Sequence, residues 1–174
     1  MLKIINEHRR VIYSLFAISI AVASNTVIAN TCNKENLADL LKIEINKLEE
    51  GIEQSIFPDK PTNITFNGYY KNKELKYFLV TTKTVQRRME RKYWILSKNN
   101  YLAEYIEIQY APYPDRTIVG KIGNYFYICG GKVVKIEELK DIRPLKYPEY
   151  AINSTMNIYN ESVKNTIYRL KNEK

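Results

Sequence analysis

Histidine, the side chain best suited to proton transfer near neutral pH, occurs only once in the 174 residues, as His8. His8 lies near the N-terminus, in a stretch that we predict below to be a removable leader. Without it, the chain has no Ser-His-Asp or Cys-His nucleophile system and no histidine-based zinc or iron site. The sequence also lacks a glycine-rich phosphate-binding loop. We therefore expect no metal and no other cofactor.

Glu104 is the carboxylate best placed for acid–base chemistry. It stands among Leu102, Ile106 and Ile108, on the mostly apolar face of an expected strand. A carboxyl group in apolar surroundings can act as a general acid. The same residue could instead lie at a sheet edge or pair with a basic residue, and one isolated acid specifies no reaction. We therefore expect a protein that is not an enzyme, with a carboxylate-dependent hydrolase acting on cell-envelope polymers as the alternative.

Cys32 and Cys129 are the two cysteines of the chain. An even number of cysteines in a protein expected to be exported favours a disulfide. This bridge would close a loop of almost a hundred residues, to which the chain-entropy model assigns about 4–5 kcal/mol. The alternative is a buried thiol at Cys129 and a free Cys32 near the N-terminus.

A run of cations precedes an aromatic pair, Tyr93-Trp94, in the middle of the chain. Basic residues beside aromatic ones are typical of grooves for single-stranded nucleic acid, but export and the intervening Glu90 argue against that partner. The run is either a solvated connection between two hairpins or a patch for an acidic protein or an anionic envelope component. The candidate partner-binding residues are Arg87, Arg88, Arg91 and Lys92, followed by two tyrosines expected to be exposed, Tyr101 and Tyr105.

Three passages that share one pattern must position these residues. Each begins with aromatic residues, continues through a polar or glycine turn and ends in a second apolar stretch, which is typical of a β-hairpin. They span residues 69–79, 93–102 and 125–134, and Gly130-Gly131 fits the positive φ angles of a two-residue turn. Together they predict an antiparallel β-meander of about five to seven strands, with its longest inter-hairpin loop at residues 111–116.

One amphipathic helix is expected before the meander in the sequence, and one after it. In residues 33–56 apolar side chains recur every three or four positions, which predicts an N-terminal helix of about five to six turns that packs on the sheet. A C-terminal helix is expected to begin near Ser154 or Thr155. Its apolar face would comprise Met156, Tyr159, Val163, Ile167 and Leu170.

Residues 1–29 have the pattern of a secretory signal peptide. Three basic residues and one acid lie in the first ten positions, and residues 11–23 carry no charge. This apolar stretch is too short for a transmembrane helix, which needs about 20 residues. We expect cleavage after Ala29, with Ala23 as the alternative site. The other possibility is an uncleaved amphipathic or membrane-anchoring helix.

Removal of residues 1–29 leaves 145 residues, with 24 basic against 18 acidic side chains. This length suffices for a single α+β domain at residues 30–174. Abundant Ile, Lys, Asn and Tyr, all with AT-rich codons, favour a low-GC bacterium, and the destination is then the periplasm or the exterior. We expect a small, disulfide-bonded binding protein, of the inhibitor or immunity type, without stable membrane insertion once the leader is removed.

Overall fold

The computed structural model of the chain describes residues 32–51, 54–55 and 63–172. The predicted signal peptide and both of its predicted cleavage sites lie outside the described residues. None of the described helices is long and apolar enough to cross a membrane.

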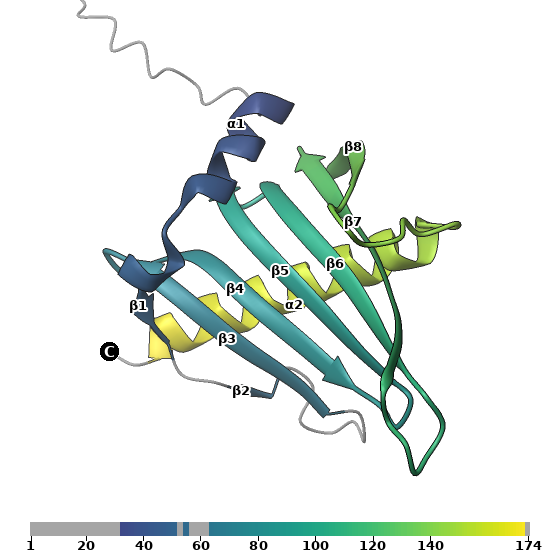
Figure 1. Cartoon of the computed structure of the whole chain (residues 1–174). Helices are drawn as coiled ribbons and strands as arrows, with labels where there is room; N and C mark the ends of the chain where they lie inside the picture. Colours follow the sequence, from purple (N-terminus) through teal and green to yellow (C-terminus); the bar gives the residue numbers. More distant parts are fainter. Residues whose placement is uncertain (1–31, 52–53, 56–62, 173–174) are drawn as a thin grey trace, which may run out of the picture.

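An antiparallel meander forms the centre of the molecule (Figure 1). Among the described residues, seven strands follow one another in the order β1-β3-β4-β5-β6-β7-β8, and β2 pairs with β3 beside this path. The predicted meander is therefore confirmed. The strands are β1 (Glu49–Glu50), β2 (Gln54–Ser55), β3 (Asn63–Lys71), β4 (Glu74–Lys83), β5 (Arg87–Ser97), β6 (Asn100–Tyr110), β7 (Ile118–Cys129) and β8 (Lys132–Glu138).

All three predicted hairpins are present, and each turns where the sequence indicated. The β3–β4 turn has positive φ angles at Asn72 (52°) and Lys73 (64°), and the β7–β8 turn has them at Gly130 (59°) and Gly131 (73°). Two successive positive φ angles give the twist that matches the flanking strands. The longest inter-hairpin connection, residues 111–117, also lies where the two prolines predicted it.

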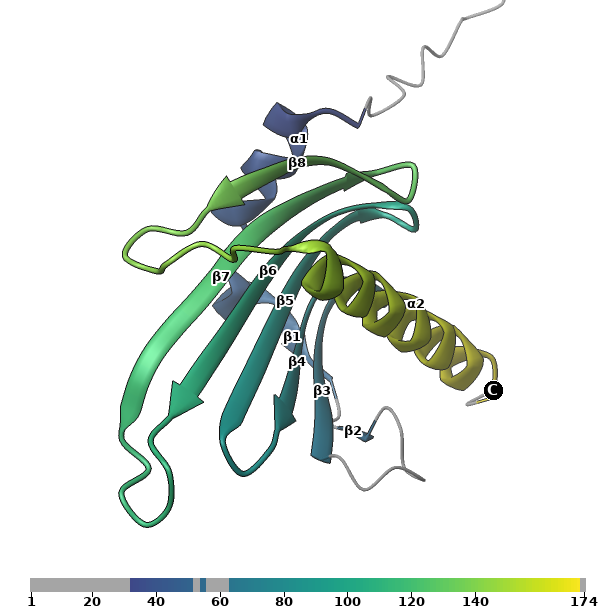
Figure 2. The ribbon, with the colours of Figure 1, turned by 90° about the vertical axis from the view of Figure 1, so that its right-hand side faces the viewer.

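Helix α2 (Glu149–Asn172) lies diagonally across one face of the sheet (Figures 1 and 2). Tyr159 stacks on Tyr101 at a ring distance of 3.6 Å, and Phe78 stacks on Tyr93 at 4.3 Å. The predicted C-terminal helix is confirmed, but it begins at Glu149 and not near Ser154. The carbonyl of Pro148, directly before the first helical residue, accepts the first helical bond, from Ile152 N–H at 2.8 Å.

The N-terminal segment covers the upper end of the opposite face, in front of the sheet in Figure 1. Leu37 is fully buried there with Tyr77, Trp94, Leu102 and Tyr127. The segment consists of α1 (Lys34–Asp39) and the 3-10 turns η1 (Leu40–Lys42) and η2 (Ile45–Lys47).

The predicted N-terminal helix over residues 33–56 is therefore wrong in its length. Asn33 caps the helix start, accepting a bond from Asn36 N–H at 2.8 Å, but the helix ends at Asp39. Beyond it, Ile45 and Leu48 pack on the sheet from a 3-10 and extended chain. Apolar residues at helical spacing can thus be partly buried without a helix when a sheet face is available. Positions 52 and 56 of the predicted stripe lie outside the described residues.

The predicted disulfide is confirmed. Cys32 and Cys129 are joined at an S–S distance of 1.94 Å, and their Cα atoms are 5.6 Å apart. The bridge ties the start of the described chain to the end of β7, beside α1.

Candidate functional site

Two connections meet at the end of the sheet far from α1, at the bottom of Figure 2. They are the β4–β5 turn, residues 84–86, and the β6–β7 loop, residues 111–117. Tyr110 N–H donates to Gln86 O at 3.0 Å and so joins the two. Within the turn, Thr84 N–H donates to Arg87 O at 2.8 Å and Arg87 N–H donates to Thr84 Oγ1 at 3.1 Å. These bonds fix the position of the residues between them.

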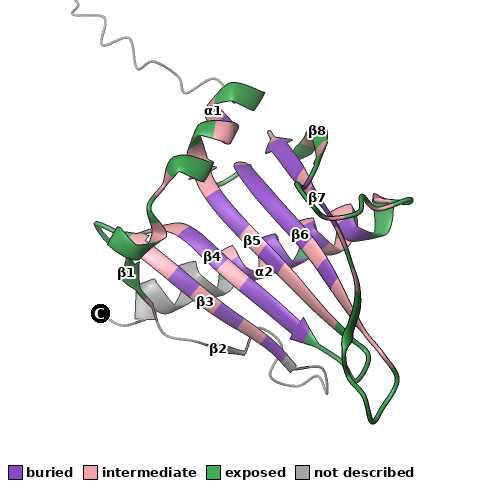
Figure 3. Cartoon of the chain, viewed as in Figure 1, coloured by how far each residue is buried: buried purple, intermediate pink, exposed green. Residues whose placement is uncertain are grey.

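A pocket of about 370 Å³ lies between these connections. We call it the basic pocket, because four of its seven lining residues are cations and none is an acid. It is lined by Lys83, Arg87, Arg88 and Arg116, together with Thr84, Val85 and Tyr110. Figure 3 shows this end of the molecule as largely exposed, whereas buried residues occupy the middle of β4, β5 and β6.

The charges around the basic pocket are only partly compensated. Arg87 lies 3.4 Å from Glu107, and Arg88 lies 2.6 Å from Glu90. Among the described residues, neither Lys83 nor Arg116 has a carboxylate within ion-pair distance. An acidic ligand would therefore bind Lys83 and Arg116 without displacing a carboxylate from either of them.

The turn and loop that form the basic pocket, and the start of β7 that follows the loop, carry exposed apolar side chains. Val85 and Tyr113 retain 73% and 79% of their accessible surface, and Ile118 and Val119 at the start of β7 retain more than half. The guanidinium of Arg116 lies 5.9 Å from the centre of the Tyr113 ring. Aromatic residues and arginine together are enriched at protein–protein interfaces. This end of the molecule therefore combines charge with apolar contact area.

Arg91 does not belong to the basic pocket, although the sequence grouped it with Arg87 and Arg88. It is 3% exposed, on the face that α2 covers. Its guanidinium donates to Thr82 Oγ1 at 3.3 Å and to Ser154 Oγ at 2.9 Å. The predicted connection is in fact part of β5, so successive side chains alternate between faces. Arg91 is therefore a core residue and is not available to a partner.

Lys92 lies on the other face, paired with Glu104 at 2.5 Å. Glu104 is only 7% exposed. Of the alternatives that the sequence left open for Glu104, pairing with a basic residue is the one observed. Lys92 is therefore committed to a partly buried ion pair, and it is not among the residues that line the basic pocket.

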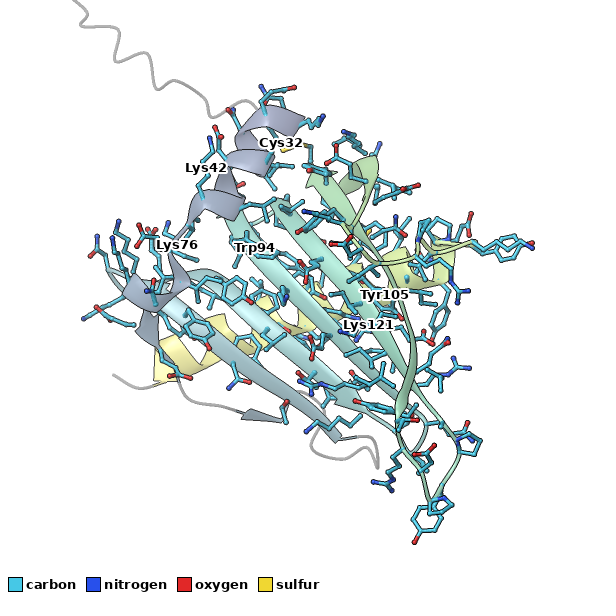
Figure 4. All side chains as sticks on the ribbon, in the orientation of Figure 1. Cys32, Lys42, Lys76, Trp94, Tyr105 and Lys121 are labelled. Carbon is cyan, nitrogen blue, oxygen red and sulfur yellow. A yellow bond between two sulfur atoms is a disulfide. The ribbon has the colours of Figure 1, made fainter. Side chains whose placement is uncertain are left out.

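Tyr101 and Tyr105 are 2% and 1% exposed, so the expectation of exposed tyrosines is wrong. Tyr101 stacks on Tyr159 of α2, and the Tyr105 ring lies 5.2 Å from the guanidinium of Arg91, which bonds Ser154 of α2. The sequence could not assign α2 to that face; Figure 4 labels Tyr105 on β6. The Tyr105 hydroxyl donates to Glu107 Oε2 at 3.3 Å. Burial raises the pKa of Tyr105 to about 12, although the nearby positive charge of Arg91 acts to lower this pKa.

Sequence reasoning missed Lys83 and Arg116. A signal for both was present, because alternate connections of a meander lie at the same end of the sheet. The β4–β5 turn and the proline-containing loop therefore had to be neighbours, which brings Arg116 beside Arg87.

The described residues contain no group of three or more His, Cys, Asp or Glu side chains placed to hold a metal ion. In comparisons with known proteins, no protein-family model matches the chain, and no curated protein or solved structure shows a significant match to it.

Proposed function

We propose that this is an exported, non-catalytic binding protein whose basic pocket holds an acidic segment of a protein partner, as an inhibitor or immunity-type protein would. The observation that carries the proposal is the convergence of four cations from three segments on one pocket. Lys83 comes from the end of β4, Arg87 and Arg88 from the start of β5, and Arg116 from the β6–β7 loop.

The surroundings of the pocket favour a protein over a small anion. Val85 and Tyr113 offer apolar surface that a small anion would leave in water. In such an interface the cations accelerate encounter with an acidic partner, and the apolar contacts slow its release. The ordered turn and loop reduce the entropy that is lost when the complex forms.

Two observations support export. Residues 1–29 have the pattern of a secretory leader, and the Cys32–Cys129 disulfide is of a kind that persists mainly in oxidising compartments. The hydrolase alternative has less support, because Glu104, its candidate acid, is paired with Lys92.

Affinity capture from envelope extracts tests this proposal. The bait is the mature chain, residues 30–174, compared with a variant carrying Arg87→Ser, Arg88→Ser and Arg116→Ser. A matched control removes three exposed lysines elsewhere, with Lys98→Ser, Lys132→Ser and Lys164→Ser. We expect a stoichiometric partner that the wild type and the lysine control retain and the arginine variant loses. A partner retained equally by all three baits would refute the assignment to the basic pocket.

A further inference from the structure

A second hollow lies at the opposite end of the sheet, beneath the N-terminal segment. It is a groove of about 520 Å³ between residues 40–48, which we call the strap, and the ends of β3, β4 and β5. Its apolar lining consists of Leu40, Ile43 and Leu48 from the strap and of Ile95 and Leu96 from β5. Figure 4 labels Lys42 and Lys76 at this end of the molecule. Its volume lies within the range of small-molecule sites, about 300–1,000 Å³.

The strap is fastened on both sides of the groove. On one side, the Cys32–Cys129 disulfide and the fully buried Leu37 hold α1 against the sheet. On the other side, Glu49 of β1 pairs with Tyr70 of β3, and Gly51 N–H donates to Gly68 O at 2.6 Å. These attachments hold the strap in place, so the groove exists before any ligand arrives.

Four lysines surround the apolar lining, and Glu44 is the one acid among the residues that line the groove. The lysines are Lys42, Lys47, Lys71 and Lys76. Three of them form ion pairs between solvent-exposed atoms: Lys42 pairs with Asp39, Lys47 with Glu44 and Lys76 with Glu74. Exposed pairs of this kind contribute little, so the lysines can turn to another anion at small cost. For Lys71, no carboxylate of a described residue lies within ion-pair distance.

We infer that this groove binds the anion of a medium-chain fatty acid. Its acyl chain would lie on the apolar residues under the strap, and its carboxylate would meet the surrounding lysines. An acidic peptide fits less well, because its backbone would place polar groups against an apolar wall without partners. The site lies at the other end of the sheet from the basic pocket and does not depend on the function proposed for that pocket.

Calorimetric titration of the disulfide-bonded mature protein with dodecanoate, below its micellar concentration, tests this inference. We expect one saturable site. Ile43→Trp should weaken binding at least about tenfold, because the larger side chain fills the groove and takes the space of the acyl chain. Lys71→Ser with Lys76→Ser should weaken it several-fold and reduce its salt dependence. The matched control, Lys98→Ser with Lys132→Ser, and the Arg87/Arg88/Arg116 serine variant should both bind like the wild type.

Three results would overturn the inference. The first is the absence of saturable binding to the wild type. The second is equal affinity for the neutral analogue dodecanol, which would show that the lysines do not contribute to binding. The third is wild-type affinity in the Ile43→Trp variant, shown by circular dichroism to be folded, which would locate the ligand outside the groove.

Discussion

Arg91 lies between the sheet and α2, and its guanidinium bonds two hydroxyl groups, those of Thr82 and Ser154. Among the described residues, no carboxylate lies within ion-pair distance of it, and its Nε has no hydrogen-bond partner. A buried cation without a counter-charge carries a desolvation cost that hydroxyl bonds only partly offset. Arg91 therefore contributes to packing and to the docking of α2, and not to the charge of the surface.

Substitutions at Arg91 should separate its packing from its charge. Arg91→Met keeps most of the volume and removes the charge, so we expect unfolding free energy within about 1 kcal/mol of the wild type, or higher. Arg91→Ala leaves a cavity and should cost about 2–4 kcal/mol. Urea unfolding measures both. The control is Arg88→Met, a substitution of a partly exposed side chain on the opposite face, which should change the unfolding free energy little. If Arg91→Met lowers the unfolding free energy as much as Arg91→Ala does, the charge itself stabilises the protein.

Glu137 should dominate the acid sensitivity of the β8 region. Hydrogen bonds from Lys135 and then from Tyr127 lower its pKa to about 2 in the folded protein. A carboxyl whose folded pKa lies below its unfolded value stabilises the fold above the unfolded pKa, and this contribution is lost as the pH falls. The loss should therefore occur between about pH 4.5 and pH 2.

Unfolding of the wild type and Glu137→Gln across this range measures the effect. The wild type should lose more stability on acidification than Glu137→Gln. The neighbouring Glu138→Gln, at an exposed position, should follow the wild type. Parallel curves for wild type and Glu137→Gln would contradict the assignment.

At the scale of elements, β6 and β7 approach closely at Gly123. A Cβ atom there would collide with the carbonyl oxygen of Tyr105 and lie 3.2 Å from Ile106 Cα, both backbone atoms. Gly123→Ala should therefore destabilise the protein by more than about 2 kcal/mol. Gly120, on the same strand, is the matched control, because its nearest neighbour is Gln109 Oε1 at 3.5 Å. Thermal unfolding compares the two, and equal stability of both alanine variants would refute the close approach.

The disulfide joins α1 to the end of β7 across a sequence separation of 97 residues. A disulfide that closes a loop of this length stabilises the fold more than one that closes a short loop, because it removes more conformational entropy from the unfolded chain. Cys129→Ser should lower the unfolding free energy by about 2–5 kcal/mol, and Cys32→Ser should lower it equally. Guanidinium unfolding with and without reductant provides the measurement. If reductant leaves the wild-type midpoint unchanged, the bridge contributes nothing.

The hairpins were predictable because their signals are local. Asn72 and Gly130-Gly131 occupy positions with positive φ, and the apolar runs on either side fix the strands. The start of α2 was placed too late, because Ser154 and Thr155 are residue types that favour a helix cap and Pro148 is not. The N-terminal helix could not be excluded locally, because the spacing of Leu37, Ile45 and Leu48 suits a helix and a sheet-covering strap equally.

The candidate site was predictable in part for the same reason. Arg87 and Arg88 stand out in the sequence, whereas Arg116 joins them only through the meander. Burial of Arg91, Tyr101 and Tyr105 depends on which face α2 covers, and that is decided by contacts between segments far apart in the sequence. Long-range packing, and not turn chemistry, therefore accounts for these errors.

The whole molecule has two different ends. At one end, the disulfide and the strap close over the sheet and leave a lysine-edged groove. At the other end, the β4–β5 turn and the β6–β7 loop carry the basic pocket and its exposed apolar residues. The buried aromatic layers between them hold these ends apart, so one end can be altered without the other. Lys83→Ser and Arg116→Ser, at exposed positions of the basic pocket, should accordingly leave the unfolding midpoint almost unchanged, since exposed positions rarely matter by more than about 0.5 kcal/mol.

The association rate of the captured partner, measured against salt concentration, tests the role of the basic pocket most directly. For the wild type, we expect the rate to fall steeply as salt screens the cations. In the variant with Arg87, Arg88 and Arg116 replaced by serine, it should be at least about tenfold slower and nearly independent of salt. The control variant with Lys98, Lys132 and Lys164 replaced by serine should match the wild type. Association that is insensitive to salt and equally fast in all three proteins would contradict binding through the basic pocket.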